Sequence, residues 1–179
     1  MRIRKFFLIA IAAYLGGCCG SPFYLRPAAK SIPEGKSLVF GEISVISDVK
    51  PKSIVYFDME FQIIDIKSSE VVFVHQIKRY KGPFYWLLPP GQYAILNMAV
   101  RYREESIRKT SWRRIYAEFT VDSPSLNIYI GDLYIDWIRK DRFVTLKDDY
   151  DKALRVLHAD YPNLQGVSVK RLLKLEEEP

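Results

Sequence analysis

The chain contains almost no cysteine. Of its 179 residues only Cys18 and Cys19 are cysteines, and the two are adjacent. No other thiol is available for a disulfide scaffold, so the rest of the chain must be stabilised by packing of a hydrophobic core. A chain of this length is normal for one domain with a single core.

Motifs of the common catalytic, metal and nucleotide sites are missing as well. The sequence has no HExxH, no Gly-x-Ser-x-Gly elbow, no P-loop and no GxGxxG. Its two histidines, His75 and His158, do not have the spacing of metal ligands, and we expect both to be structural. We therefore expect no catalytic residue, no metal and no other cofactor. An enzyme is the least favoured of the functions considered below.

The chain is only weakly basic once its first residues are set aside. The net charge is +6, from 27 basic and 21 acidic residues. Three of the basic residues, Arg2, Arg4 and Lys5, precede residue 18, which leaves 24 basic against 21 acidic residues beyond it. A surface of this balance is not a nucleic-acid footprint, so we expect no nucleic-acid partner.

The amino-terminal residues have a distinct layout. A cationic head, Met1–Lys5, precedes an uncharged apolar run, Phe6–Leu15, and two glycines. This is the layout of a secretory signal. A helix needs about 20 predominantly apolar residues to cross the hydrocarbon core, so a short permanent anchor is the weaker alternative.

The residues Leu15-Gly16-Gly17-Cys18 resemble the lipobox of bacterial lipoproteins. The resemblance implies that residues 1–17 are a signal peptide, and that Cys18 carries the acyl chains which hold the protein on a membrane. Cys19, and not an aspartate, follows the acylated position, which favours the periplasmic face of the outer membrane over the inner membrane. The alternative is that the two cysteines are an ordinary pair of small residues or a strained vicinal disulfide.

Beyond the cysteines we expect a linker and then one domain. Residues 18–36 contain Pro22, Pro27 and Pro33 with little periodicity, which predicts an extended tether. Residues 37–179 form the predicted domain. Ile54 to Ile64 alternates apolar and polar residues, as a half-buried antiparallel strand does. Similar runs occur at 38–46, 71–77, 84–88, 93–102, 115–121, 126–135 and 142–146.

This pattern predicts a mainly β fold, an antiparallel β-sandwich with one C-terminal helix. In the run 126–135 the apolar phase changes at Gly131-Asp132, which predicts a bulge. Helical spacing of apolar residues predicts the helix at about 148–160, covering an open edge or end of the sandwich. We expect Asp148, Asp149 and Asp151 to cap it, because the glycine and glutamate of a calcium-binding loop are missing. The tail after it is expected to be a final strand or a short helix.

The segment "FYWLLPPGQYAI", residues 84–95, carries a second resemblance. Pro90 and Gly91 predict a type II turn that joins two strands. The "LPPGxY" pattern resembles a turn of prealbumin-like sandwich domains, including carboxypeptidase regulatory-like and PEGA-type modules, and "LVFGEI" and "NIYIGDL" are similar to strands of uncharacterised lipoproteins of that type. The resemblance implies a prealbumin-like sandwich and a role in binding proteins or cell-wall material.

One basic segment is the candidate binding site. Within "RYREESIRKTSWRRIY" a connection between two strands is flanked by basic residues and a tryptophan: Arg101, Arg103, Arg108, Lys109, Trp112, Arg113 and Arg114. Such a hairpin suits anionic lipid headgroups, lipopolysaccharide phosphates or an acidic patch of a partner. The alternative is a solvated hairpin with partial ion pairing.

Two functions are compatible with these features. The first is a non-catalytic interaction or structural module that is lipid-anchored in the cell envelope, faces the periplasm and has an envelope protein as its partner. The alternative is a ligand-binding lipoprotein for a glycan, cell-wall or lipid component, which would use the aromatic residues Tyr80, Phe84, Tyr85 and Trp86. Core packing is the competing interpretation of those four aromatic residues.

Overall fold

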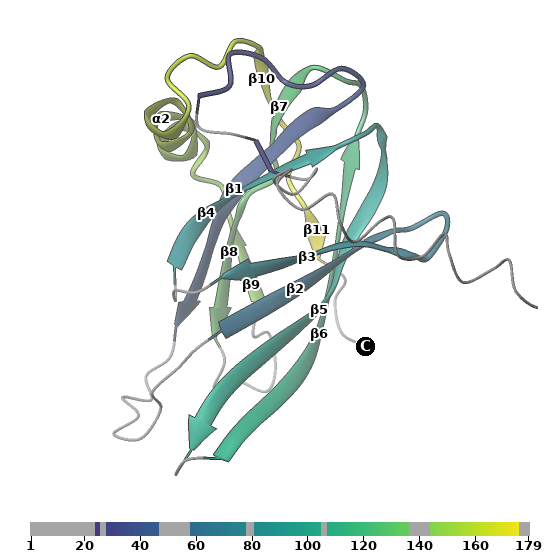
Figure 1. Ribbon diagram of the computed structural model, residues 1–179, viewed down its shortest axis with the longest axis vertical. Coiled ribbons are helices and arrows are strands. Elements are labelled where there is room, and N and C mark those ends of the chain that lie inside the picture. Colours follow the sequence, from purple (N-terminus) through teal and green to yellow (C-terminus); the bar gives the residue numbers. More distant parts are fainter. Residues whose placement is uncertain are drawn as a thin grey trace, which may run out of the picture.

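A computed structural model describes residues 24–25, 28–46, 58–77, 81–104, 107–136 and 144–175. Over these ranges the chain forms eleven strands and one helix. The strands build two sheets that pack face to face, with the helix at one end of the molecule (Figure 1). The predicted mainly β sandwich with one helix is confirmed. The candidate acylation site Cys18 lies outside the described residues.

The first sheet is organised around β1 (Ser37–Ile46). On one side, β1 pairs along its length with the antiparallel strand β4 (Lys81–Leu88). On its other side it pairs in parallel with β7 (Leu126–Tyr129) and then with β8 (Asp132–Asp136). The outer positions beside β7 and β8 are taken by β10 (Val167–Lys170), which is parallel to β7, and by β9 (Val144–Lys147), which is antiparallel to β8.

Parallel pairing of β1 with β7 and β8 departs from an all-antiparallel sandwich. Parallel neighbours require a long crossover connection. Here the chain between β1 and β7 supplies it, because that chain contains β4 and four strands of the second sheet.

The predicted bulge at Gly131 is confirmed by the register of β1. Phe40 pairs with Tyr129 and Ile43 with Leu133, so the strand opposite β1 contains one extra residue between these pairs. Gly131 has φ +105, a conformation that favours glycine. The change of apolar phase in the sequence therefore marks the point where β7 ends and β8 begins.

The second sheet is antiparallel throughout. Its order is β11 (Lys174–Leu175), β6 (Ile107–Val121), β5 (Gly91–Glu104), β2 (Asp58–Asp65) and β3 (Val71–Ile77). The tail is thus a pair of strands, β10 and β11, one in each sheet. The alternation predicted for 54–64 is confirmed within β2, whose residues Met59, Phe61 and Ile63 are fully buried. Residues 54–57 lie outside the described ranges.

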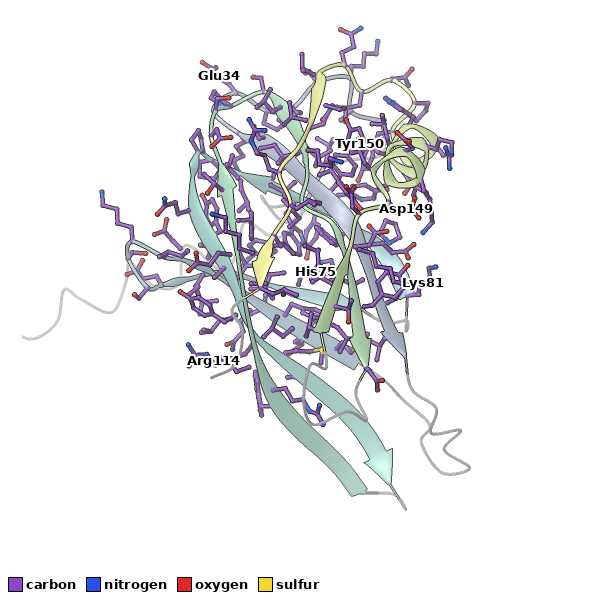
Figure 2. The ribbon with its side chains drawn as sticks, turned by 180° about the vertical axis from the view of Figure 1, so that it is seen from behind. Glu34, His75, Lys81, Arg114, Asp149 and Tyr150 are labelled. Atoms are coloured by element: carbon purple, nitrogen blue, oxygen red, sulfur yellow. The ribbon has the colours of Figure 1, made fainter. Side chains whose placement is uncertain are left out.

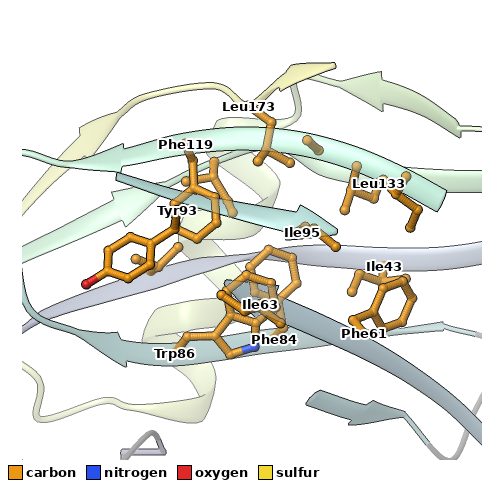
Figure 3. Close-up of a cluster of buried hydrophobic side chains, with 14 of the residues drawn as sticks. Ile43, Phe61, Ile63, Phe84, Trp86, Tyr93, Ile95, Phe119, Leu133 and Leu173 are labelled. Carbon is orange, nitrogen blue, oxygen red and sulfur yellow. The ribbon is translucent and has the colours of Figure 1, made fainter. Parts of the chain in front are cut away.

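The core fills the space between the sheets (Figure 3). Phe84 and Trp86 of β4 stack with ring centroids 4.2 Å apart, and both side chains are almost completely buried. Phe73 of β3 meets Trp86 edge to face at 5.6 Å, so the aromatic cluster joins the two sheets.

The turn at Pro89-Pro90 crosses from one sheet to the other, since β4 belongs to the first sheet and β5 to the second. The predicted type II turn is wrong, because Gly91 is not among the residues with positive φ. Gly91 already belongs to β5 and pairs with Val121. It is needed for space: a Cβ at this position would lie 3.0 Å from the hydroxyl of Tyr93, which donates a hydrogen bond to the carbonyl of Pro89 at 2.9 Å.

The helix α2 (Tyr150–Asp160) lies within the predicted range and at one end of the molecule, which is one of the two places expected for it. It packs Leu157 and the following Tyr161 against Leu38 and Phe40 of β1, on the outer face of the first sheet and not along an open edge. Predicted capping by the aspartates is also wrong. Asp149 is the N-cap but its side chain makes no capping hydrogen bond.

The second half of the predicted tether lies against the body. Leu25 is buried beside α2, and its carbonyl accepts a hydrogen bond of 3.2 Å from the hydroxyl of Tyr161. The carbonyl of Lys30 accepts a bond of 3.0 Å from the backbone N–H of Gln165. The segment around Leu25 and Lys30 is therefore part of the folded domain.

Candidate functional site

The predicted binding segment is a two-stranded ribbon at the end of the second sheet opposite the helix (Figure 1). We call residues 101–114 the basic ribbon. The neighbouring strand β2 begins at Asp58, which pairs with Arg101. Within the described ranges, β5 and β6 remain paired beyond this position as far as Glu104 and Ile107. Residues 110–114 pair with residues 97–101, which also pair with β2, so this part of the ribbon lies beside the body of the sheet.

Strand register divides the predicted site residues between two faces. Arg101 pairs with Thr110 and Arg103 with Arg108, in phase with the pairs of Asn97 with Arg114 and Ala99 with Trp112. Because paired residues share a face and alternate residues change face, five site positions fall on one face, which we call the outer face of the ribbon. They are Arg101, Arg103, Arg108, Trp112 and Arg114.

The other two predicted positions, Lys109 and Arg113, fall on the opposite face. Arg113 pairs with Met98, a fully buried member of the core cluster, and Lys109 pairs with Tyr102. Their face thus continues the inner, core-facing side of the sheet. The structure brings five of the seven site residues onto one surface and separates two from it.

The described side chains of the outer face are accessible. Trp112 is 53% exposed, and Arg114 is exposed with its guanidinium carbon 5.2 Å from the ring centre of Tyr116. Arg114 lies at the margin of the molecule (Figure 2). Tyr116 has φ +46 and stands where the register of β5 and β6 shifts, so a bulge interrupts their pairing between Ile95 and Asn97.

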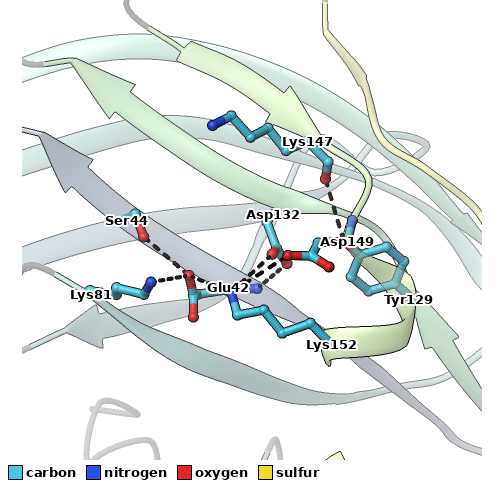
Figure 4. A network of polar contacts seen from close by, with 8 residues as sticks. All are labelled: Glu42, Ser44, Lys81, Tyr129, Asp132, Lys147, Asp149 and Lys152. Atoms are coloured by element: carbon cyan, nitrogen blue, oxygen red, sulfur yellow. Dashed lines mark hydrogen bonds and ion pairs between the residues drawn. The ribbon is translucent and has the colours of Figure 1, made fainter. Parts of the chain in front are cut away.

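A second polar cluster, which the sequence analysis missed, joins the helix to the first sheet (Figure 4). Glu42 of β1 lies 3.1 Å from Lys81 of β4 and 3.5 Å from Lys152 of α2. Its backbone N–H donates to Asp132 of β8 at 3.0 Å. The other carboxylate oxygen of Asp132 lies 4.0 Å from the Lys152 ammonium. The cluster connects four elements that are distant in the sequence.

Burial affects the protonation of Asp132, whose side chain is 1% exposed. Desolvation raises the pKa of this carboxyl group, while the N–H of Glu42 and the charge of Lys152 act in the opposite direction. The adjoining cavity, between Phe40, Tyr85 and Lys152, has a volume of about 10 Å³, which is room for one water molecule. We interpret the cluster as a structural connection, because it links β1, β4, β8 and α2.

His75 has the structural role expected of it. It is buried in β3, and its Nδ1 lies 2.9 Å from the hydroxyl of Tyr24. The rings of Phe84 and Trp86 surround it at 6.4 Å and 5.6 Å, and burial lowers its pKa to about 4. It is therefore neutral near pH 7 and fixes the amino-terminal segment to the sandwich. The other histidine, His158, is exposed on α2.

The aromatic residues of the ligand-binding alternative are not arranged as a binding surface. Phe84 and Trp86 are core residues, as the competing interpretation predicted. Tyr85 donates a hydrogen bond of 2.6 Å to Asp160 and meets the ring of Tyr161 edge to face. Tyr80 lies outside the described residues.

Two further properties concern only the described part of the chain. Among its side chains, no group of three or more His, Cys, Asp or Glu residues is placed to hold a metal ion. Within the same ranges, no helix has the length and apolar character needed to cross a membrane. Comparison of the chain with protein-family models, with curated proteins and with solved structures gives no match in any of the three.

Proposed function

We propose that this protein is a lipid-anchored, non-catalytic interaction module of the bacterial cell envelope. Residues 1–17 direct export, Cys18 receives the lipid, and the sandwich faces the periplasm, with the outer membrane favoured as its location. The lipobox-like residues Leu15 to Cys18 support the anchor. The partner is an envelope component that meets the exposed surface of the sandwich.

The observation that carries the proposal is the docking of the segment that follows the cysteine pair. Tyr24 and Leu25 lie against the body through His75 and Tyr161. Five residues lie between Cys18 and Tyr24, and a fully extended chain over these six residue steps spans at most about 20 Å. A lipid on Cys18 therefore holds the sandwich close to the membrane surface.

The distribution of polar groups supports an interaction role. Asp132, whose side chain is 1% exposed, adjoins a cavity of about 10 Å³, and Phe84 and Trp86 of β4 are packed in the core. By contrast, Trp112 of β6 is 53% exposed. An aromatic side chain that could contact a partner is thus on the surface.

Acyl labelling tests the proposal. Wild type, Cys18→Ala and Cys19→Ala are expressed in a bacterium that is fed a palmitate analogue, and the cells are fractionated. Wild type and Cys19→Ala are expected to carry the label and to sediment with membranes, while Cys18→Ala carries none. An unlabelled wild-type protein that still contains residues 1–17 and has a free thiol at Cys18 by mass spectrometry contradicts the proposal.

A further inference from the structure

Amide side chains gather on the outer face of the second sheet, the face turned away from the core. Phe61 and Met98 are core residues that pair with each other, so the positions on either side of them along β2 and β5 face outward. Strand register places these outward positions in two rows across β6, β5, β2 and β3, which we call the amide face. The first row is Trp112, Ala99, Glu60 and Gln76, and the second row is Arg114, Asn97, Gln62 and Val74.

Hydrogen bonds between neighbouring strands hold three amides of this face in place. Asn97 donates from Nδ2 to Oε1 of Gln62 at 3.1 Å, and Gln76 donates from Nε2 to Oε1 of Glu60 at 2.8 Å. A primary amide has two donor hydrogens and an acceptor oxygen, so each of these bonds uses only part of the side chain. The N–H donors of Gln62 and the oxygens of Asn97 and Gln76 are not used by them. The face thus presents donors and acceptors whose orientation is already fixed, which lowers the entropy cost of binding.

Trp112 gives the amide face a broad apolar contact. Its side chain is 53% exposed, while Ala99 beside it is fully buried and has no atoms beyond Cβ that would cover the indole ring. At the other end of the rows, Val74 is 41% exposed and Gln76 is exposed. Three strand spacings of about 4.8 Å separate these ends, so the face is about 14 Å wide.

The chemistry of the face fits a neutral sugar chain. Its described charged side chains are Glu60 and Arg114, one of each sign, so the two rows carry no net charge that would select a polyanion. A pyranose ring has apolar C–H faces that stack on an indole ring, and hydroxyl groups at its rim that pair with amides. An acetamido group on the sugar adds an N–H and a carbonyl that pair with primary amides, and a methyl group that suits an apolar neighbour such as Val74.

We propose that the amide face binds a glycan strand of N-acetylated hexosamines, with Trp112 stacked on one sugar ring and the amides of Gln62, Gln76 and Asn97 paired with acetamido and hydroxyl groups. The width of the face suits several linked sugars. Strands of this class form the bacterial cell wall, and the meeting of protein and cell wall in the periplasm rests on the function proposed above. A glycan without acetamido groups is an outcome of the test below.

Two tetrasaccharides with the same backbone test the acetamido contacts. Chitotetraose carries an acetamido group on each ring where cellotetraose carries a hydroxyl group. Binding is measured by calorimetry with the full chain carrying Cys18→Ala, so that no acyl chain contributes. Because hydrogen bonds to the acetamido groups are lost in cellotetraose, the protein is expected to bind chitotetraose about tenfold more tightly. Equal binding of the two sugars, or no binding of chitotetraose, overturns the proposal.

Single variants locate the binding surface. Trp112→Ala is expected to weaken binding of chitotetraose about 20-fold, through the lost ring stacking and apolar contact. Gln62→Ala is expected to weaken it about tenfold. Gln92→Ala is the matched control, because Gln92 is an exposed glutamine of β5 outside the two rows, and it should bind like the parent. Unchanged binding by Trp112→Ala overturns the proposal even if Gln62→Ala does not fold, since Trp112 is a surface residue.

Two further measurements identify the contact and its source. Chitotetraose is expected to shift the fluorescence emission of the parent to shorter wavelength, and this shift is absent in Trp112→Phe. In cosedimentation, the parent is expected to pellet with purified peptidoglycan sacculi while Trp112→Ala stays in the supernatant. A shift that persists in Trp112→Phe, or binding to lipopolysaccharide but not to sacculi, counts against the proposal.

The two proposals fail separately. If Cys18 is not acylated but chitotetraose binding is lost in Trp112→Ala, the lipid anchor is wrong and the amide face stands. If Cys18 is acylated and the protein binds neither chitotetraose nor sacculi, the anchor stands and the amide face is wrong.

Discussion

The hydroxyl of Tyr24 lies 2.9 Å from Nδ1 of His75, a residue 51 positions further along the chain. This hydrogen bond places the amino-terminal segment beside β3 of the second sheet, while Leu25 is buried beneath α2 of the other layer. Two consecutive residues thus contact opposite parts of the sandwich. Burial lowers the pKa of His75, so the ring that contacts Tyr24 is neutral near pH 7.

Acid should weaken the fold through His75. Its pKa is lowered from 6.5 to about 4 in the folded chain, so between these values the unfolded chain binds more protons and stability falls as the pH falls. Wild type is expected to lose up to about 3 kcal/mol of unfolding free energy between pH 6.5 and pH 4, relative to His75→Gln. Urea unfolding at a series of pH values measures this, and His158→Gln serves as an exposed control that behaves like wild type. Parallel curves for wild type and His75→Gln contradict the assignment.

Gly41 is expected to be intolerant of any side chain. A Cβ there collides with the backbone carbonyl of Gly131 and with the ring of Phe84, so neither neighbour yields easily. Gly41→Ala should cost about 3 kcal/mol or abolish folding. Gly82 in β4 is the matched control, because nothing lies within 4 Å of a Cβ built at that position. Thermal unfolding of the two variants compares them, and similar midpoints rule out the close approach of the two strands.

The charge of Asp132 should matter less than its hydrogen bond. Asp132→Asn keeps an oxygen acceptor for the N–H of Glu42, whereas Asp132→Ala leaves that buried donor without a partner. We expect Asp132→Ala to be less stable than Asp132→Asn by about 2 kcal/mol at pH 7. Since burial raises the pKa of Asp132, wild type also loses stability relative to Asp132→Asn as the pH rises from 3.8 through the folded pKa. Equal stability of the two variants argues against the role of the hydrogen bond.

Sequence patterns predicted most strands because apolar alternation follows burial. The run 71–77 matches β3 at both ends. The runs at 93–102 and 115–121 are shorter than β5 and β6, because residues 107–114 at the start of β6 do not alternate apolar and polar residues. The type II turn predicted after β4 was wrong. The residues Pro89-Pro90-Gly91 indicate that the chain turns, but the sheet that each of the two strands joins depends on pairing with distant strands.

The candidate site was predicted as a list of residues but not as a surface. Alternation within one strand puts Arg101 and Arg103 on the same side, but the side of Arg108 and Arg113 depends on register across the hairpin. That register depends on the bulge near Tyr116, and no residue in the sequence indicates a bulge at this position. The Glu42, Asp132 and Lys152 cluster left no signal, because its members come from β1, β8 and α2.

The parallel pairing of β1 with β7 also affects how fast the protein can fold. Ser37 accepts a hydrogen bond from the backbone of Leu126, 89 positions later, and the pairs that follow are equally remote. Contacts so distant in sequence slow the search for the native state. Residues 126–136 must therefore be available before the first sheet can be completed.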